Sequence, residues 1–471
     1  MRLNQIFASG ALALMIAVLG LNSAQAQNEI TAETLIGKSV SDITDAMSKP
    51  IEEAITLFKN RQFEDARNKL KTACKANPQM PPAGVIMAQL FVAANQGLAA
   101  RGELERCVLA DPTDPEPYLV FGDLAFQNRQ ITESGLCFDK AHDLAQAYKS
   151  NATRKRNLQI RAYAGQAAVA AAREQHKTEE ELLTKWISLE PDSTAAYTRL
   201  ARCQYRQGGS DNEKKAYATF AKLYDEIDKE KDPSKKVPRP EINMAVLYTQ
   251  DDKAANAERL MSLAMERATP DDINTRLAVA QWALENGKMT LAKQAGAAAY
   301  KVDPESLQAM LLLGVASRYE GDAAKAEQWF RAAHAKTPSN FAVINNLALT
   351  LIEQPDETKR RQALEFAQLN QRVNNNLQTP AGREAAATLS WAAFQLGQEA
   401  QAEQGIIQVL QSGSVSNEAA YHAAQILNKR GRAAQARQIL EPLVKQNGFF
   451  PGKEDAKSLL AKLASEGDLL P

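Results

Sequence analysis

The stretch LGVASRYEGDAAKAEQWFRAAHAKTP, residues 313–338, carries the pattern that decides the fold. Gly314 and Ala326 are small residues at positions where a helix face ordinarily carries a longer apolar side chain. Two helices whose axes pack about 8–10 Å apart need small residues at their closest contact. The stretch therefore predicts two antiparallel helices joined by a short turn. In that turn Gly321 ends the first helix and Asp322 caps the second.

The same pattern recurs at a spacing of 34 residues along the chain. Pro270, Pro304 and Pro338 follow this spacing, and so do Pro78 and Pro112. Four more pairs keep the register: Gly287 with Gly321, Ala292 with Ala326, Gly397 with Gly431, and Ala402 with Ala436. A period of this length indicates stacked helix-turn-helix units, each of which buries its apolar face only against its neighbours.

This unit resembles the tetratricopeptide repeat, which has Leu-Gly on its first helix, Ala and a large apolar residue on its second, and Pro after it. In the quoted stretch those places hold Leu313-Gly314, Ala326, Phe330, Ala333 and Pro338, and an earlier unit has Phe121-Gly122. The resemblance implies an all-α fold, a right-handed superhelical α-solenoid of about eleven repeats. Two units depart from the pattern: one has Glu179 where a small residue is expected, and the next needs extra residues around Gly208-Gly209 to align.

The chain divides into six segments on this interpretation. Residues 1–26 read as a signal peptide, because Arg2 precedes an apolar run from Ile6 to Leu21 and the small-x-small sequence Ala24-Gln25-Ala26. Export to the periplasm or outside the cell is therefore expected. The other segments are a leader (27–46) that is either a short helix or loose, repeats (47–227), a charged linker with three prolines (228–240), further repeats (241–450), and a capping helix with a tail (451–471).

Composition argues against several functional classes. The 56 basic and 56 acidic residues balance, so no net basic field favours nucleic acid. No apolar run in the mature chain is long enough for a transmembrane helix. The four histidines lack the paired spacing of a zinc site, so neither a metal nor another cofactor is predicted. The four cysteines lie within helical patterns and read as small buried residues, with a bridge between neighbouring helices as the alternative.

Proteins of the resembled family usually hold a peptide or a helix of a partner protein in the groove lined by their first helices. Helical geometry places the groove on the first-helix face away from Leu313-Gly314. The groove residues predicted for the later repeats are Leu277, Gln281, Leu311, Val315, Arg318, Asn345, Leu349, Trp391 and Phe394. Their counterparts in the early repeats are Ile51, Val85, Leu119 and Phe126. Packing against neighbouring helices is the alternative role for each of these side chains.

The favoured function is an exported, non-catalytic scaffold that binds a protein or peptide partner in a cell-envelope assembly. A scaffold component of a polysaccharide or protein export machine is the alternative. An envelope enzyme accessory or a glycan-cleaving enzyme is less favoured, because the repeats occupy the chain and no nucleophile elbow or phosphate loop is present.

Overall fold

The turn inside most helix pairs of the described residues contains one residue with a positive φ. At the predicted turn Gly321 has φ of 84°, and Asp322 caps the next helix by accepting a hydrogen bond from the N–H of Lys325 at 3.0 Å. Other turns of this kind also use glycine, at Gly287, Gly397 and Gly431. Early repeats place other residue types there, with φ between 56° and 61° at Arg61, Asn95, Arg129, Glu174 and Asp252. The unit therefore persists where its glycine signature is lost.

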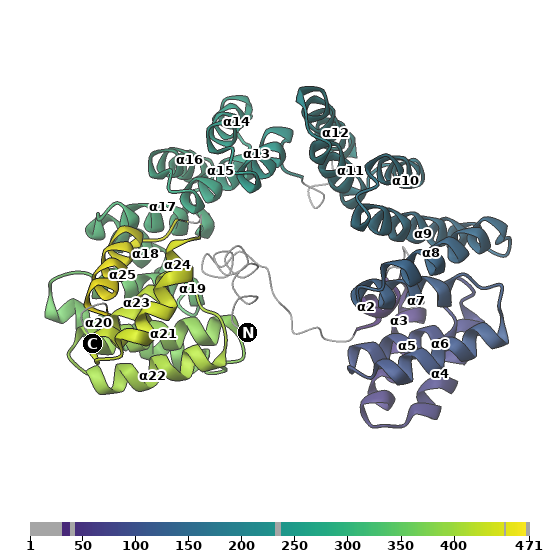
Figure 1. Cartoon of the computed structure of the whole chain (residues 1–471), viewed down its shortest axis with the longest axis horizontal. Coiled ribbons are helices and arrows are strands. Elements are labelled where there is room, and N and C mark those ends of the chain that lie inside the picture. The colour runs from purple at the N-terminus through teal and green to yellow at the C-terminus, as the bar shows by residue number, and fades with distance from the viewer. Residues whose placement is uncertain (1–30, 38–42, 231–236, 447–448, 468–471) are drawn as a thin grey trace. The chain divides into compact units, whose positions relative to one another are not determined.

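The computed structural model describes residues 31–37, 43–230, 237–446 and 449–467. Within these ranges the chain is all-α, and the predicted α-solenoid fold class is confirmed (Figure 1). The early helices are α2 (Ala32–Ile36), α3 (Asp45–Lys59), α4 (Phe63–Ala76), α5 (Ala83–Ala93), α6 (Gly97–Ala110), α7 (Glu116–Gln127), α8 (Ile131–Ala147), α9 (Ala152–Ala172), α10 (His176–Leu189), α11 (Thr194–Arg206), α12 (Ser210–Glu230), α13 (Pro240–Gln250) and α14 (Ala254–Arg267). The later helices are α15 (Ile273–Glu285), α16 (Met289–Val302), α17 (Leu307–Tyr319), α18 (Ala323–Lys336), α19 (Phe341–Ile352), α20 (Glu357–Val373), α21 (Pro380–Gln395), α22 (Glu399–Ser412), α23 (Asn417–Lys429), α24 (Ala433–Val444) and α25 (Lys453–Gly467).

The contacts of the described residues divide the chain into two compact units. The N-terminal unit ends at Ala257 and the C-terminal unit begins at Glu258, a division that falls inside α14. The predicted signal peptide lies wholly outside the described residues, and the predicted leader and the linker 228–240 lie partly outside them. These predicted boundaries stay predictions. In the described part of the chain, no helix is long and apolar enough to cross a membrane.

The small residues of the repeat make room for a large side chain at the helix crossing. A Cβ added to Gly314 on α17 would lie 2.5 Å from the Cε1 of Phe330 on α18. The earlier pair of α7 and α8 repeats this arrangement, because a Cβ on Gly122 would lie 2.7 Å from the Cε1 of Phe138. Phe330 is fully buried, as is the nearby signature residue Ala326. Glycine is therefore required where the aromatic ring of the second helix packs onto the backbone of the first.

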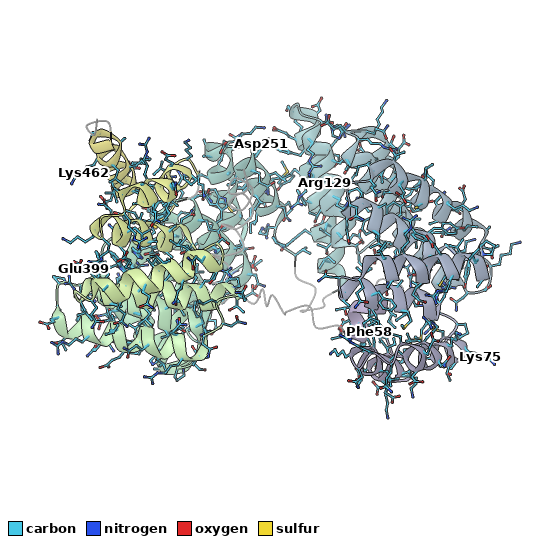
Figure 2. All side chains as sticks on the ribbon, turned by 60° about the horizontal axis from the view of Figure 1, so that its bottom comes forward. Phe58, Lys75, Arg129, Asp251, Glu399 and Lys462 are labelled. Atoms are coloured by element: carbon cyan, nitrogen blue, oxygen red, sulfur yellow. The ribbon has the colours of Figure 1, made fainter. Side chains whose placement is uncertain are left out.

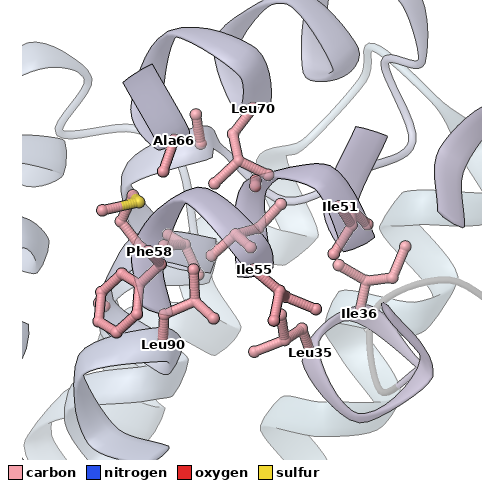
Figure 3. Packing of buried hydrophobic residues seen from close by; sticks show 14 of the residues in the cluster. Leu35, Ile36, Ile51, Ile55, Phe58, Ala66, Leu70 and Leu90 are labelled. Atoms are coloured by element: carbon pink, nitrogen blue, oxygen red, sulfur yellow. The ribbon is translucent and has the colours of Figure 1, made fainter. Parts of the chain in front are cut away.

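The first repeats share one continuous core with the short helix α2. Leu35 and Ile36 of α2 pack with Ile51 and Ile55 of α3 and with Leu90 of α5, as Figure 3 shows. Residues of α2 thus cover the apolar face that the first repeat presents. The last repeat is covered in the same way by α25, whose Leu463 and Ala456 are buried against α24. Apolar faces at the ends of a stack need such covers, since no further repeat buries them.

Candidate functional site

Most of the predicted groove residues are buried in the structure. Leu277, Leu311, Val315, Arg318, Asn345, Leu349 and Trp391 are each at most 8% exposed, whereas Gln281 and Phe394 are half-buried. Ile51, Val85 and Leu119 are also buried, and Phe126 is half-buried. A side chain with so little exposed area has almost no surface to give a partner in this conformation. Their binding role stays a prediction.

The face of the C-terminal unit that carries the predicted groove residues, called the inner face below, is filled in part by the contacts of Arg318. Its guanidinium donates to Glu353 through Nε at 2.9 Å and to Glu418 on α23 through Nη1 at 3.3 Å, and Nη2 contacts both carboxylates. Glu418 lies 100 residues further along the chain. First helices three repeats apart, α17 and α23, are therefore joined by one buried cation. Arg318, Glu353, Glu418, His422 and Trp391 are called the inner cluster below.

Aromatic stacking completes the inner cluster. The ring of Trp391 on α21 lies 4.1 Å from that of His422 on α23, with 4° between the planes, and it also stacks on Phe394. Burial lowers the pKa of His422 to about 4, with Glu418 opposing this shift and Arg318 adding to it. His422 is therefore neutral at pH 7, and the stack is a packing contact between two repeats.

The inner cluster also has a definite charge arrangement. Burial acts to raise the pKa of Glu418, but the charge and hydrogen bonds of Arg318 outweigh it and hold this pKa below its usual value. At Glu353 burial is the larger influence, and the pKa is raised despite Arg318. The pKa of Arg318 is raised well above its usual range by the two carboxylates, although burial opposes this. Arg318 thus stays charged and forms ion pairs with both carboxylates.

A second buried carboxylate fixes the start of α23. Glu384 on α21 accepts hydrogen bonds from the backbone N–H of Ser416 at 2.5 Å and from its hydroxyl at 3.0 Å. The same hydroxyl accepts from the N–H of Ala419 and caps α23. Burial raises the pKa of Glu384 to about 7. These bonds position α23, and with it Glu418, against the inner face.

An accessible pocket of about 380 Å³ lies in the N-terminal unit instead, at the ends of α11 and α13. Its lining residues are Arg202, Tyr205, Arg206, Gly208, Gly209, Glu213, Leu247, Gln250, Asp251 and Lys253. Asp251, labelled in Figure 2, stands just past the end of α13. Gly208 and Gly209 have φ of 71° and 82° and lead from α11 into α12. This set of residues is called the α11–α13 pocket.

Part of the pocket wall is held by internal hydrogen bonds. The Tyr205 hydroxyl donates to Asp251 at 2.7 Å, and the Tyr248 hydroxyl donates to Glu213 at 2.9 Å. Lys253 donates to Glu213 at 3.0 Å and lies over the rings of both tyrosines. The hydrogen bond from Lys253 lowers the pKa of Glu213. Burial, and next the hydrogen bond to Asp251, raise the pKa of Tyr205 to about 12.

Two arginines in this pocket are left to the solvent. Arg202 and Arg206 are exposed, and no carboxylate of the described residues forms an ion pair with either. Lys253 balances Glu213, and Asp251 offsets one of the two arginines, so the charged side chains that line the pocket carry a net charge of about +1 beside a tyrosine ring. Guanidinium groups pair well with carboxylates, often through two hydrogen bonds at once. The pocket can therefore receive an acidic polypeptide segment.

None of the residues predicted from the sequence to bind a partner lines this pocket. The one feature of the sequence that pointed to the pocket is the irregular repeat spacing at Gly208-Gly209, because this turn borders the pocket. Irregular turns in repeat proteins often carry the binding residues, because they leave the stacking contacts unchanged.

Comparison with known families agrees with the repeat pattern in the middle of the C-terminal unit. Residues 277–341 match the tetratricopeptide repeat family. This segment contains the stretch from Leu313 to Pro338 and the helix pair α15 and α16 before it. None of the curated proteins matches the sequence significantly.

Solved structures with a similar arrangement come from bacteria and yeast. A thermophilic TPR protein of Thermus thermophilus is 19% identical, with 41% of this chain and 99% of that chain covered and a TM-score of 0.35. Yeast Tom70 is 12% identical, with 89% of this chain and 96% of that chain covered and a TM-score of 0.39. A tetratricopeptide repeat protein of Parabacteroides merdae is 14% identical, with coverages of 65% and 98% and a TM-score of 0.34.

Proposed function

Because the chain is built from tetratricopeptide repeats, we propose that it is a non-catalytic scaffold that binds an acidic segment of a partner protein in the α11–α13 pocket. Stacked helical repeats of this kind form extended surfaces on which partner proteins bind. The observation that carries the proposal is the pair of exposed arginines in an accessible pocket, Arg202 and Arg206, which have no acidic partner among the described residues. An acidic segment would supply the missing carboxylates.

The chemistry of the pocket supports binding over catalysis. A general acid or base works best with a pKa near the operating pH. The pKa of Tyr205 is raised to about 12, and the pKa of Lys253 is raised further above its usual value by its hydrogen bond to Glu213. Neither group exchanges protons readily near pH 7. Their hydrogen bonds instead hold the wall in one shape, which lowers the entropy cost of binding.

Position-specific cross-linking tests the proposed pocket. A photoreactive residue in place of Gln250, which is exposed and lines the pocket, is expected to cross-link a partner in intact cells. The partner peptide joined to it should be rich in Asp or Glu. The reversals Arg202→Glu and Arg206→Glu together should abolish the product, because they replace attraction by repulsion.

Matched controls make the outcome decisive. The same photoreactive residue at Leu136, which is 68% exposed on α8, should give no such product. Reversals of equal charge at the exposed residues Arg129 and Lys140 should leave the Gln250 product intact. Equal products from Gln250 and Leu136, or a product unaffected by the pocket reversals, would contradict the proposal.

We further propose that the scaffold acts in a cell-envelope assembly after export. This rests on the pattern of residues 1–26, which lie outside the described residues. The mass of the chain recovered from cell fractions is the measurement. A chain in the envelope fraction that begins at Gln27 is expected, whereas a full-length chain confined to the cytoplasmic fraction would refute export.

A further inference from the structure

The first turn of α10 holds a carboxylate where other repeats hold a small residue. Ala100, Ala292 and Ala326 occupy this place elsewhere, and Ser134 satisfies its hydroxyl by donating to the carbonyl of Gly122 at 2.9 Å. At Glu179 the carboxylate is only 3% exposed, beside the crossing of α9 and α10. Burying a carboxylate is strongly unfavourable unless another group compensates its charge. A buried Glu179 carboxylate therefore requires a group that compensates its charge.

Two other ligand-type side chains meet this carboxylate. His176 lies one turn earlier on α10, and Cys203 comes from α11 of the next repeat. One ligand atom from each of His176, Glu179 and Cys203 lies within 4.8 Å of the other two. The Cys203 thiol is fully buried and donates to the carbonyl of His176 at 3.3 Å. Imidazole, carboxylate and thiol thus converge on one point between two repeats.

The facing polar atoms lack hydrogen-bond partners. His176 Nδ1 and Glu179 Oε2 are buried, lie 3.8 Å apart, and have no hydrogen-bond partner within the described residues. This separation is too long for a hydrogen bond but close to that of two ligands on one tetrahedral zinc ion, which are about 3.3–3.5 Å apart. Unsatisfied buried polar atoms are rare in native proteins, and an ion is one of the explanations for them.

An arginine that lies close to Glu179 contacts other groups instead. Arg199 on α11 is close enough to feel the charge of Glu179, but its Nη2 donates to the carbonyl of Ala164 at 3.1 Å. Its guanidinium also lies 5.5 Å from the centre of the Trp186 ring. In the described part of the chain, Glu179 therefore has no guanidinium partner, although Arg199 is close to it.

We propose that His176, Glu179 and Cys203 bind a divalent transition-metal ion of the zinc type. Zn²⁺ binds nitrogen, oxygen and sulfur ligands, and a site with three protein ligands takes water as the fourth ligand. On binding, the S–H bond of Cys203 breaks, a metal–sulfur bond forms, and the proton goes to the solvent. Side-chain rotations that shorten the distances between the three ligand atoms by less than about 1.5 Å would bring these atoms to the spacing found around a zinc ion. The His176 side chain is 32% exposed, which places the cluster near the protein surface, although the Nδ1 atom itself is buried.

A bound ion would fasten α10 to α11. The Cys203 ligand lies on α11 between Arg202 and Tyr205, which line the α11–α13 pocket. The metal site does not depend on the proposed function, because its ligands point into the helix packing and their contacts exist without a partner protein.

Titration of the untagged, metal-free full chain tests the site. With Co²⁺ as the probe, binding of about one equivalent should produce the absorption of a thiolate-to-cobalt charge transfer, and added Zn²⁺ should displace it. Glu179→Ala is expected to weaken Zn²⁺ binding by at least about 100-fold. It should fold normally, since alanine occupies this place in other repeats. Cys203→Ser should abolish the absorption.

Cys137→Ser is the matched control, because Cys137 is a thiol outside the cluster. It should retain both the absorption and the affinity. Absence of the thiolate absorption in the wild-type chain, or Zn²⁺ affinity in Glu179→Ala equal to wild type, would overturn the proposal. Cross-linking from Gln250 is read out separately, so failure of the metal site and failure of the pocket are distinguishable.

Discussion

Replacing Phe330 with alanine is expected to lower the free energy of unfolding of the C-terminal unit by about 3–5 kcal/mol. Phe330 is fully buried, and its ring lies against the backbone of Gly314 on the neighbouring helix. Its removal takes apolar area out of the core and leaves a cavity between two helices that glycine has brought close. Denaturant titration followed by tryptophan fluorescence measures the effect, and the transition assigned to the C-terminal unit should move.

Val373→Ala is the control for this change. Val373 is 64% exposed on α20, so its truncation should alter stability by less than about 0.5 kcal/mol. A thermodynamic cycle with Gly314→Ala adds a sharper test. The alanine Cβ would meet the Phe330 ring in the wild-type chain but would have room in Phe330→Ala. The double variant should therefore be more stable than the sum of the single effects indicates, and strict additivity would contradict the close crossing.

Replacing Arg318 with methionine is expected to destabilise the C-terminal unit by about 3–5 kcal/mol at pH 7. The Arg318 side chain is 2% exposed, and its loss leaves the carboxylates of Glu353 and Glu418 close together without their cation. Thermal and denaturant unfolding measure this loss. Arg361→Met is the control, because Arg361 pairs with Glu357 on the surface, where screening by water makes an ion pair weak.

The pH dependence of the Arg318 effect has a definite sign. In the wild-type chain the pKa of Glu418 is below its usual value, so its contribution is present above the unfolded pKa and is lost as the pH falls through the folded pKa. Without Arg318, burial would raise the pKa of both carboxylates, and they would take up protons at a higher pH. The deficit of Arg318→Met should therefore shrink as the pH falls from 7 towards about 4.5, near the ordinary carboxyl pKa. A deficit independent of pH would contradict the ionic role of Arg318.

The repeat itself was predictable because its determinants are local. The turn at Gly321 and Asp322 depends on a glycine φ and one cap, and the crossing at Gly314 depends on the ring of Phe330 within the same unit. Such contacts are encoded by spacing along one stretch of chain. They recur in early units even where arginine or asparagine replaces the glycine of the turn.

The inner cluster and the proposed metal site depend instead on how successive repeats pack against one another in three dimensions. The contact of Arg318 with Glu418 needs three further repeats to curve back by the right amount, and no local pattern gives that curvature. For the same reason, helical geometry predicted that Arg318 and Trp391 line the groove, whereas in the structure both side chains are buried against neighbouring repeats. The cluster of His176, Glu179 and Cys203 combines one helix with the next repeat, and a search for paired histidines does not detect it.

Hydroxyl-radical footprinting of the full chain tests most directly whether the inner face of the C-terminal unit is filled by the chain's own side chains. Trp391 and Leu311 are expected to be strongly protected from oxidation, while Leu98, which is 91% exposed, and Leu136 react freely and calibrate the scale. Oxidation of Trp391 at the rate of an exposed tryptophan would show an open groove. That result would contradict the packing of the inner cluster and would favour partner binding on the inner face.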